Sequence, residues 1–241
     1  MKRAVCALCG IFLLFMSCSK KNDNPFFSKF GTPFETPAFN KIENEHYLPA
    51  FKAGIKQDSL EIAAVAANPA APTFENTLEA LDRTGELLST VTGVYYNMLE
   101  ANTDDTLQQI SNEIAPLLSK HSDDVLLNEK LFQRVKAVYD QREGLTLTPE
   151  QQTLLEKWYK DFVRGGANLA PEQKERMRKI NEDLSVLTLK FGDNVLAETN
   201  AFELVIDNEN DLSGLTAGII STAADAAKNR GKEGKWVFTL H

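Results

Sequence analysis

Apolar residues recur at three- and four-residue steps through residues 148–200, and this stretch predicts two helices. The first helix begins with a capping signal, in which Thr148 is followed by Pro149 and then by Gln151. It ends at Gly165-Gly166, because glycine adopts the left-handed backbone conformation that closes helices. We expect one face of this helix to be buried. The apolar residues of that face are Leu154, Leu155, Trp158, Tyr159, Phe162 and Val163.

The second helix of the pair begins at Pro171. At 1.5 Å per residue, we expect it to be roughly 40 Å long. Charged residues cover its outer face, and the spacing of its apolar stripe approximates a heptad repeat. We therefore expect a long packed helix that can form one wall of a large domain. The stripe consists of Met177, Ile180, Leu184, Leu187, Phe191 and Val195.

Further helices are predicted before this pair, each with apolar residues at helical spacing. Asn68-Pro69 ends the first of them, and Thr73 and Asn76 both suit the cap of the next. The predicted ranges are 42–67, 78–101, 106–122 and 128–142.

After Asn200 the spacing of the apolar residues changes from the helical period to the alternation that is typical of a strand. Residues 201–206 predict a strand, residues 215–229 an alanine-rich helix and residues 236–240 a second strand. The predicted fold class is mainly α, a multi-helix domain with a small β element beginning near residue 201. Two strands and a helix do not form a stable sheet alone. The chain stops at His241 just as this second region begins, so we expect a truncation.

The composition is that of an ordinary globular protein, with 43% hydrophobic and 25% charged residues. The formal net charge is −8; without residues 1–18, which include Lys2 and Arg3, 24 basic against 34 acidic residues leave −10. An acidic chain without a clustered basic face is poorly suited to bind nucleic acid. We therefore exclude nucleic acid as a partner.

Residues 1–18 predict a lipoprotein signal peptide. Two basic residues precede the apolar run 4–16, which is too short for a membrane-spanning helix. The tetrapeptide Phe15-Met16-Ser17-Cys18 resembles a bacterial lipobox, so Cys18 is the predicted lipidation site. This predicts a lipid-anchored protein of the cell envelope and leaves open which side of the membrane it faces. The other cysteines, Cys6 and Cys9, lie inside the signal, so we expect no disulfide or thiol chemistry.

Residues 19–36 predict a tether followed by an extended arm, because prolines keep the arm from being helical. Its aromatic residues are too numerous for a free linker, so we expect the arm to pack on the body; exposed recognition aromatics are the alternative. These aromatic residues are Phe26, Phe27, Phe30, Phe34 and Phe39. The predicted domains are then the signal at 1–18, the arm at 19–36, a helical domain at 37–200 and a mixed α/β region at 201–241.

Catalytic motifs are missing from the sequence. A catalytic zinc site commonly uses two histidines one helical turn apart with a glutamate between them, and the chain has only His46, His121 and His241 without that spacing. We expect His121 to lie at a helix end, and the acidic pair Asp123-Asp124 to act as caps at a helix boundary. The run 230–235 superficially suggests phosphate binding, but it lacks the strand-to-helix context, so a solvated turn is the better interpretation. We predict no catalytic, cofactor-binding or metal-binding residue in this chain.

Several segments, in this order, resemble one family. They are residues 34–42, 45–51, 68–77, 97–102, 114–116 and 164–169, among them the sequences FETPAFNKI, EHYLPAF, NPAAPTFENT and RGGANL. Together they are similar to the bacterial peptidyl-dipeptidases of the thimet oligopeptidase family of zinc metallopeptidases. The resemblance covers about residues 30 to 241.

The resemblance implies a mostly helical enzyme of the neurolysin and thimet oligopeptidase fold, with a deep channel that admits oligopeptide substrates. It also implies a zinc ion held by a His-Glu-x-x-His motif and a later glutamate, and release of C-terminal dipeptides. This chain matches only the N-terminal helical part, and the zinc and catalytic positions lie beyond His241. We therefore expect the isolated chain to bind no zinc and to be inactive.

Three interpretations remain open from the sequence. The chain is the N-terminal piece of a lipid-anchored zinc peptidyl-dipeptidase, or a non-catalytic helical envelope lipoprotein that binds peptides or a partner, or one half of a split enzyme. A downstream reading frame with the zinc motif favours the first or the third. A soluble, monodisperse 241-residue product favours the second.

The lipobox generates a direct test. The variant Cys18→Ala should move the protein from the membrane fraction to the soluble fraction, because the acylated sulfur is lost. Cell fractionation followed by immunoblotting measures this, and an unchanged distribution would contradict lipidation at this residue.

Overall fold

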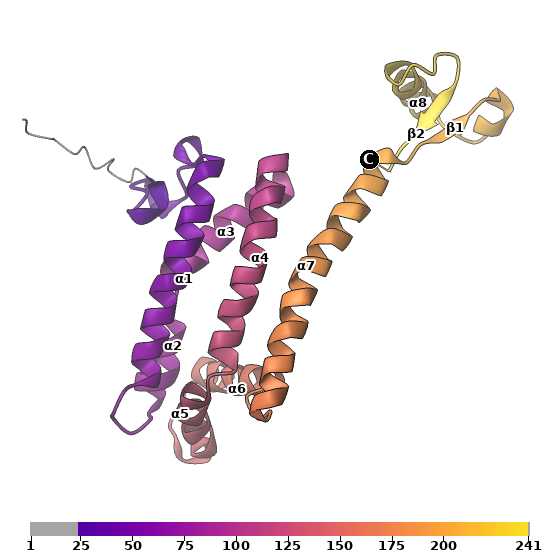
Figure 1. The fold of residues 1–241 in the computed structure, drawn as a ribbon. Helices are drawn as coiled ribbons and strands as arrows, with labels where there is room; N and C mark the ends of the chain where they lie inside the picture. Colours follow the sequence, from indigo (N-terminus) through magenta and orange to yellow (C-terminus); the bar gives the residue numbers. More distant parts are fainter. Residues whose placement is uncertain (1–23, 241) are drawn as a thin grey trace, which may run out of the picture.

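The computed structural model describes residues 24–240, and the chain is mainly α, as the sequence predicted (Figure 1). The predicted signal peptide, the lipidation site Cys18 and the terminal His241 lie outside the described residues. No helix between residues 24 and 240 has the length and apolar character needed to cross a membrane.

Three long helices form the upper body: α1 (Asn44–Ala66), α3 (Glu86–Ala101) and α4 (Asp105–Leu126). α1 packs against both α3 and α4 (Figure 1). Tyr95 of α3 lies at the centre, where the rings of Tyr47 and Phe51 meet it edge to face. Its hydroxyl lies 2.6 Å from both the Leu107 carbonyl and the Ser111 hydroxyl, so this buried polar group is satisfied.

The N-terminal end of α4 is capped as its sequence requires. The Asp104 carboxylate accepts the Leu107 N–H at 2.7 Å and the Asn44 amide at 2.8 Å. These hydrogen bonds, the backbone one foremost, lower the pKa of the Asp104 carboxyl. The same side chain thereby joins the start of α4 to the start of α1.

A second core lies below, around α5 (Glu129–Asp140) and α6 (Pro149–Arg164). It also includes the π-helical turn η4 (Phe74–Glu79) and the short helix α2 (Ala80–Asp82). The chain also contains short 3-10 turns, of which the first packs on the upper body: η1 (Pro25–Phe27), η2 (Pro33–Glu35), η3 (Phe39–Lys41) and η5 (Arg142–Gly144). The buried side chains of the second core are Ile62, Phe74, Leu78, Leu81, Val125, Leu131, Phe132, Val135, Val138, Leu155, Phe162 and Ala167.

Arg134 connects this second core to the segment that follows α1. Its guanidinium is buried and donates to the carbonyl oxygens of Asn68 and Ala70 at 2.8 and 3.0 Å. It also donates to the Asn76 amide oxygen at 2.8 Å and to the Thr77 hydroxyl at 3.2 Å. The connection that leaves α1 is therefore held by one side chain of α5.

The helix predicted over residues 78–101 is in fact divided among the end of η4, α2 and α3. The chain leaves α2 and turns at Gly85, where φ is +74°, before α3 begins at Glu86. A left-handed residue cannot continue a helix, and only glycine adopts that conformation without strain. The apolar periodicity continues through the break, which is why the pattern predicted one helix.

The helix predicted over residues 106–122 continues to Leu126, so the expected boundary was wrong. Asp123 and Asp124 therefore lie in the last turn of α4 and do not act as caps. His121 lies inside the helix, where it is buried. Tertiary contacts with α1 and α7 hold these polar residues in the helix against their preference for boundaries.

The predicted helix pair is present as α6 and α7 (Pro171–Ala201). The apolar stripe of α7 is exposed, however, and no side chain of this described helix is fully buried. α7 packs on α4 near its start and then diverges from it, so its second half projects from the body (Figure 1). The expected packing along the stripe is absent from residues 24–240.

A small module follows α7. Strands β1 (Leu204–Ile206) and β2 (Trp236–Phe238) pair antiparallel, with Val205 opposite Val237. Between them lie η6 (Glu209–Leu212) and α8 (Ala217–Asn229), and α8 covers β2. The module sits at the far end of α7, away from the helical body (Figure 1).

The arm divides into a packed part and an exposed part. Phe26 is buried against Tyr47 and Phe30. Phe34 is 99% exposed and, unusually for a non-glycine residue, has a left-handed backbone with φ of 59°. The expectation that the arm packs on the body is therefore correct for Phe26 and Phe30 but not for Phe34.

The contact between α1 and α3 depends on Gly54. A Cβ atom there would lie 2.9 Å from the Cα of Leu88, which is backbone and cannot move aside alone. Gly54→Ala should lower the free energy of unfolding by about 1–3 kcal/mol through overpacking.

Gly93 is the matched control for this prediction. It lies exposed on α3, and a Cβ atom there would meet nothing within 4 Å. Gly93→Ala should raise the free energy of unfolding by about 0.5–1 kcal/mol, because alanine is the better helix former. Urea denaturation followed by circular dichroism measures the free energy of unfolding of both variants. A loss of stability in both would contradict the claim that Gly54 is needed for the close approach of α1 and α3.

Candidate functional site

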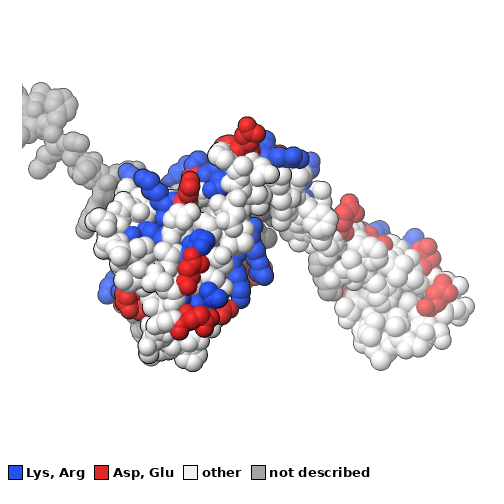
Figure 2. Space-filling view, turned by 90° about the horizontal axis from the view of Figure 1, so that it is seen from below, with Lys and Arg blue, Asp and Glu red and all other residues white. Residues whose placement is uncertain are grey.

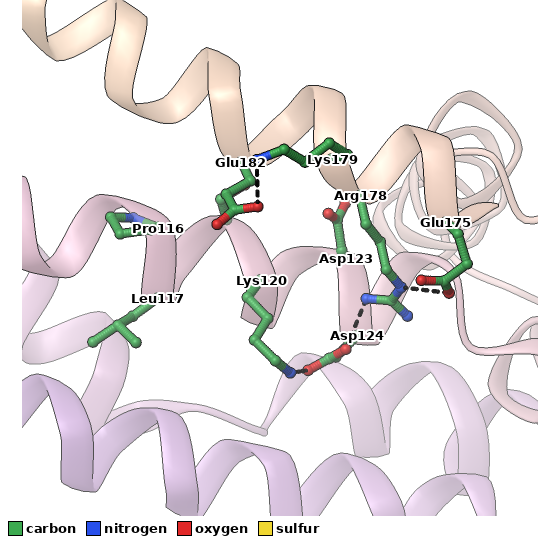
Figure 3. Close-up of a pocket in the computed structure, with 10 residues that line it drawn as sticks. Pro116, Leu117, Lys120, Asp123, Asp124, Glu175, Arg178, Lys179 and Glu182 are labelled. Atoms are coloured by element: carbon green, nitrogen blue, oxygen red, sulfur yellow. Dashed lines mark hydrogen bonds and ion pairs between the residues drawn. The ribbon is translucent and has the colours of Figure 1, made fainter. Parts of the chain in front are cut away.

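A charged cleft between α4 and α7 is the candidate site (Figure 3). Its volume is about 560 Å³, in the range of small-ligand sites. α4 and the first half of α7 supply its walls. The lining residues are Pro116, Leu117, Ser119, Lys120, Asp123, Asp124, Glu175, Arg178, Lys179 and Glu182.

Helical spacing places these charges on facing sides of the two helices, because residues three or four apart share a face. The Arg178 guanidinium donates to the Asp124 carboxylate at 2.8 Å and so joins α7 to α4 (Figure 3). Asp124 also pairs with Lys120 on its own helix. Lys179 pairs with Glu182 at 3.1 Å. The cleft thus contains opposite charges that largely neutralise one another.

Asp123 is the buried member of the cleft, with 5% of its surface exposed. One carboxylate oxygen accepts a hydrogen bond from the Asn181 amide of α7 at 2.6 Å. The ion pairs found among residues 24–240 do not include Asp123. Its role in the observed structure is to hold α7 on α4, together with Arg178.

The face of the molecule that Figure 2 shows has no single-sign field among the described residues. Figure 2 shows basic and acidic side chains interspersed over the helical body, while much of the visible face of the C-terminal module is uncharged.

The described histidines do not gather into a metal site. His46 lies in the first turn of α1, and its Nδ1 accepts the Glu43 N–H at 2.9 Å, which makes it a capping residue. Among residues 24–240, no group of three or more histidine, cysteine, aspartate and glutamate side chains could hold a metal ion. The zinc ion that the family resemblance implies therefore does not fit the residues that the structure describes.

His121 takes part in an array that sequence reasoning missed. Its Nε2 lies 2.7 Å from a carboxylate oxygen of Asp58, and its Nδ1 lies 3.3 Å from the Ser59 hydroxyl. Asp58 and His121 are both buried, and they join α1 to α4. The partners are about 60 residues apart in the sequence, so no local motif signals them.

Ser59, His121 and Asp58 lie in the order of a hydrolase triad, but their hydrogen bonds do not have the directions that a triad requires. The Ser59 hydroxyl donates to the Ile55 carbonyl at 2.7 Å, so its proton is not directed at the imidazole as a nucleophile requires. The second oxygen of Asp58 is buried without a hydrogen-bond partner. A Cβ atom at Gly85 would lie 3.0 Å from the Asp58 carboxylate carbon, so the turn before α3 packs directly on this group. The array acts as a structural link between α1, α3 and α4.

Comparisons with known proteins identify relatives among peptidases. The chain is 39% identical to dipeptidyl carboxypeptidase of Escherichia coli over 217 residues, which are 90% of this chain and 32% of that protein. It is 27% identical to oligopeptidase A of Escherichia coli over 209 residues, covering 87% of this chain and 31% of that protein. A thimet-like oligopeptidase of Dictyostelium discoideum is 23% identical over 171 residues, 70% of this chain and 24% of that protein. No protein-family model matches the chain.

The chain thus spans about a third of the length of the curated relatives it matches. The resemblance to the N-terminal part of the thimet oligopeptidase family, first seen in the sequence segments, is confirmed by these relatives. The mainly α architecture agrees with the same resemblance.

The structural role of the Asp58–His121 pair predicts a strong energetic coupling. Asp58→Ala or His121→Ala should each lower the free energy of unfolding by about 3 kcal/mol, because either leaves a buried polar partner unpaired. The double variant should cost less than the sum of the two by at least about 1 kcal/mol. Urea denaturation of the four proteins measures the coupling.

Ser59→Ala is the control, since Ser59 is exposed and its loss should cost no more than about 0.5 kcal/mol. Additive single effects, or a Ser59 variant as unstable as the His121 variant, would contradict the proposed role of the pair.

Proposed function

We propose that this chain supplies the N-terminal helical part of a peptidase that removes dipeptides from the C-termini of oligopeptides. The 39% identity to dipeptidyl carboxypeptidase across 90% of the chain carries this proposal. The oligopeptidase A relatives point to the same class of peptide substrate. In this role the chain forms part of the wall around the peptide and does not perform the hydrolysis.

The chemistry of the described residues supports the proposal that this chain surrounds the peptide and does not hydrolyse it. Hydrolysis needs an activated nucleophile or a metal-bound water. Among residues 24–240, no cluster of three or more histidine, cysteine, aspartate and glutamate side chains could hold a metal ion, and the Ser59 hydroxyl donates to a backbone carbonyl. Any zinc ion of the complete enzyme would be held by residues other than these, so we derive no catalytic step from this chain.

The α4–α7 cleft supports a role in substrate binding. It holds acidic and basic side chains side by side, and a short peptide with a free amine and a free carboxylate carries both complementary charges. Arg178 and Asp124 are the cleft residues best placed for such contacts, because each already uses only part of its hydrogen-bonding capacity on the other helix.

We also propose that the protein is attached to the cell envelope through Cys18. The basic start, the short apolar run and the lipobox of residues 1–18 support this attachment. Oligopeptides outside the cytoplasm would then be the substrates within reach.

The second candidate is a non-catalytic helical lipoprotein that binds a peptide or a protein partner. The exposed apolar stripe of α7 favours it, because contiguous exposed apolar surface marks interaction sites. The two candidates differ in one respect: only the first requires that this chain can stand in for the matching part of a peptidase.

A chimera tests this requirement. The 217-residue segment of Escherichia coli dipeptidyl carboxypeptidase that matches this chain is replaced by the corresponding residues of this chain. The chimera should release C-terminal dipeptides from a blocked tetrapeptide with kcat/KM within roughly tenfold of the parent, a barrier change of about 1.4 kcal/mol. Liquid chromatography of the released dipeptide measures the rate.

Two controls define the outcome. The 241-residue chain alone should show no dipeptide release, because no group of side chains among residues 24–240 could hold a catalytic metal ion. A chimera with Gly54→Ala should lose thermal stability before it loses specific activity. A folded chimera without activity would refute the proposed function and leave the non-catalytic lipoprotein as the better description.

A further inference from the structure

The two halves of α7 differ in composition. Eight of the 13 residues from 171 to 183 are charged, whereas three of the 18 residues from 184 to 201 are. The first half rests on α4 through Arg178 and Asn181. The second half stands clear of the helical body (Figure 1). It combines the composition of a buried helix with the surroundings of an exposed one, because no side chain of α7 is fully buried in the described structure.

Apolar side chains of this second half point to several sides of the helix. At about 100° per residue, Leu184, Leu187 and Phe191 lie within about 60° of one another. Val186 and Leu196 lie about 100° or more around the helix from each of these three. All five side chains are between 41% and 71% exposed. A helix with apolar residues on all sides is typical of the interior of a larger protein.

We propose that the second half of α7 is enclosed by the rest of the peptidase, which is the polypeptide that the relatives have outside the matched segment. The chain spans 32% of the length of Escherichia coli dipeptidyl carboxypeptidase, so about two-thirds of such an enzyme lies outside that segment. The inference rests on the proposed function. It adds to that function the surface through which this chain joins the remaining polypeptide.

The C-terminal module extends the same surface. Among residues 24–240, 12 of the 18 large apolar residues that are exposed lie from Ile180 onward, in α7 and the module. Leu204 and Ile219 of the module are 51% and 47% exposed, and its sheet of two strands is too small for independent stability. Much of its visible face is also uncharged (Figure 2). One large partner would therefore cover α7 and the module together.

A single added helix covers too little of this surface. A second α7, or a bound helical peptide, would lie along the side that holds Leu184, Leu187 and Phe191. Val186 and Leu196 would then stay in water, although both are large apolar residues. The distribution of the apolar side chains around α7 thus favours a partner that surrounds the helix.

Cysteine labelling of the 241-residue chain and of the chimera tests the proposal. Leu187→Cys and Leu196→Cys place a thiol on opposite sides of α7, about 180° apart. A water-soluble maleimide should modify both rapidly in the chain alone. In the chimera both should react at least tenfold more slowly, because the remaining polypeptide excludes the reagent. Mass spectrometry of the peptide that carries each new cysteine gives the rate.

Leu60→Cys is the matched control. Leu60 is 65% exposed on α1, and a single exposed leucine needs no partner. Its labelling rate should differ less than about twofold between the chain and the chimera. A Leu196 variant that reacts as fast in the chimera as in the chain alone would overturn the proposal. A Leu187 variant whose labelling slows as the concentration of the chain alone rises would overturn it in favour of a second copy.

Co-purification gives a second measurement that does not depend on the folding of the chimera. The part of Escherichia coli dipeptidyl carboxypeptidase outside the matched segment, co-expressed with the 241-residue chain, should co-purify with it. Leu187→Asp/Leu196→Asp should reduce the co-purified amount at least tenfold, and Leu60→Asp should leave it unchanged. An unfolded chimera together with no co-purification would overturn the proposal.

The labelling result and the activity of the chimera separate the two proposals. A chimera in which both α7 cysteines are protected but which releases no dipeptide would refute the proposed function and leave this interface intact. An active chimera in which both cysteines react as in the chain alone would overturn the interface and leave the proposed function intact.

Discussion

The arrangement of the helical body depends on one buried cation. Arg134 lies in the lower core, yet all of its hydrogen-bond partners are neutral: two carbonyl oxygens, an amide oxygen and a hydroxyl. Removing a charge from water is costly unless such groups replace the solvent. Since those partners belong to the segment after α1 and to η4 itself, the guanidinium fixes the chain at the point where it leaves the upper body. The position of α5 then determines where α6 and α7 begin.

Polar side-chain pairs join α4 to its two long neighbours, α1 and α7. Asp58 and His121 join α1 to α4, and Asp123 and Asn181 join α4 to α7. Each of these links joins two specific side chains, so each allows few alternative packings. The hydrophobic clusters supply most of the stabilisation, while these polar pairs determine the register of one helix on the next.

The sequence predicted the helices well, because caps and apolar periodicity are local signals. Thr148 and Gln151 form the capping box expected of them, and Thr73 and Asn76 form another. The break at Gly85 and the extension of α4 to Leu126 could not be predicted, since both depend on contacts with Asp58, Asn181 and other distant residues. The absence of a local catalytic motif was visible in the sequence. The α4–α7 cleft was not, because periodicity predicts that α7 has an apolar stripe but not which of its faces meets α4.

The placement of the C-terminal module at the end of α7 has a mechanical consequence. α7 has 31 residues and is about 46 Å long, and among residues 24–240 it contacts the helical body near its start. Long helices bend gently, and a tilt of about 5° at its start would displace the far end by about 4 Å. The orientation of β1, α8 and β2 relative to the helical body is thus set by the stiffness of one helix and by the few hydrogen bonds at its foot.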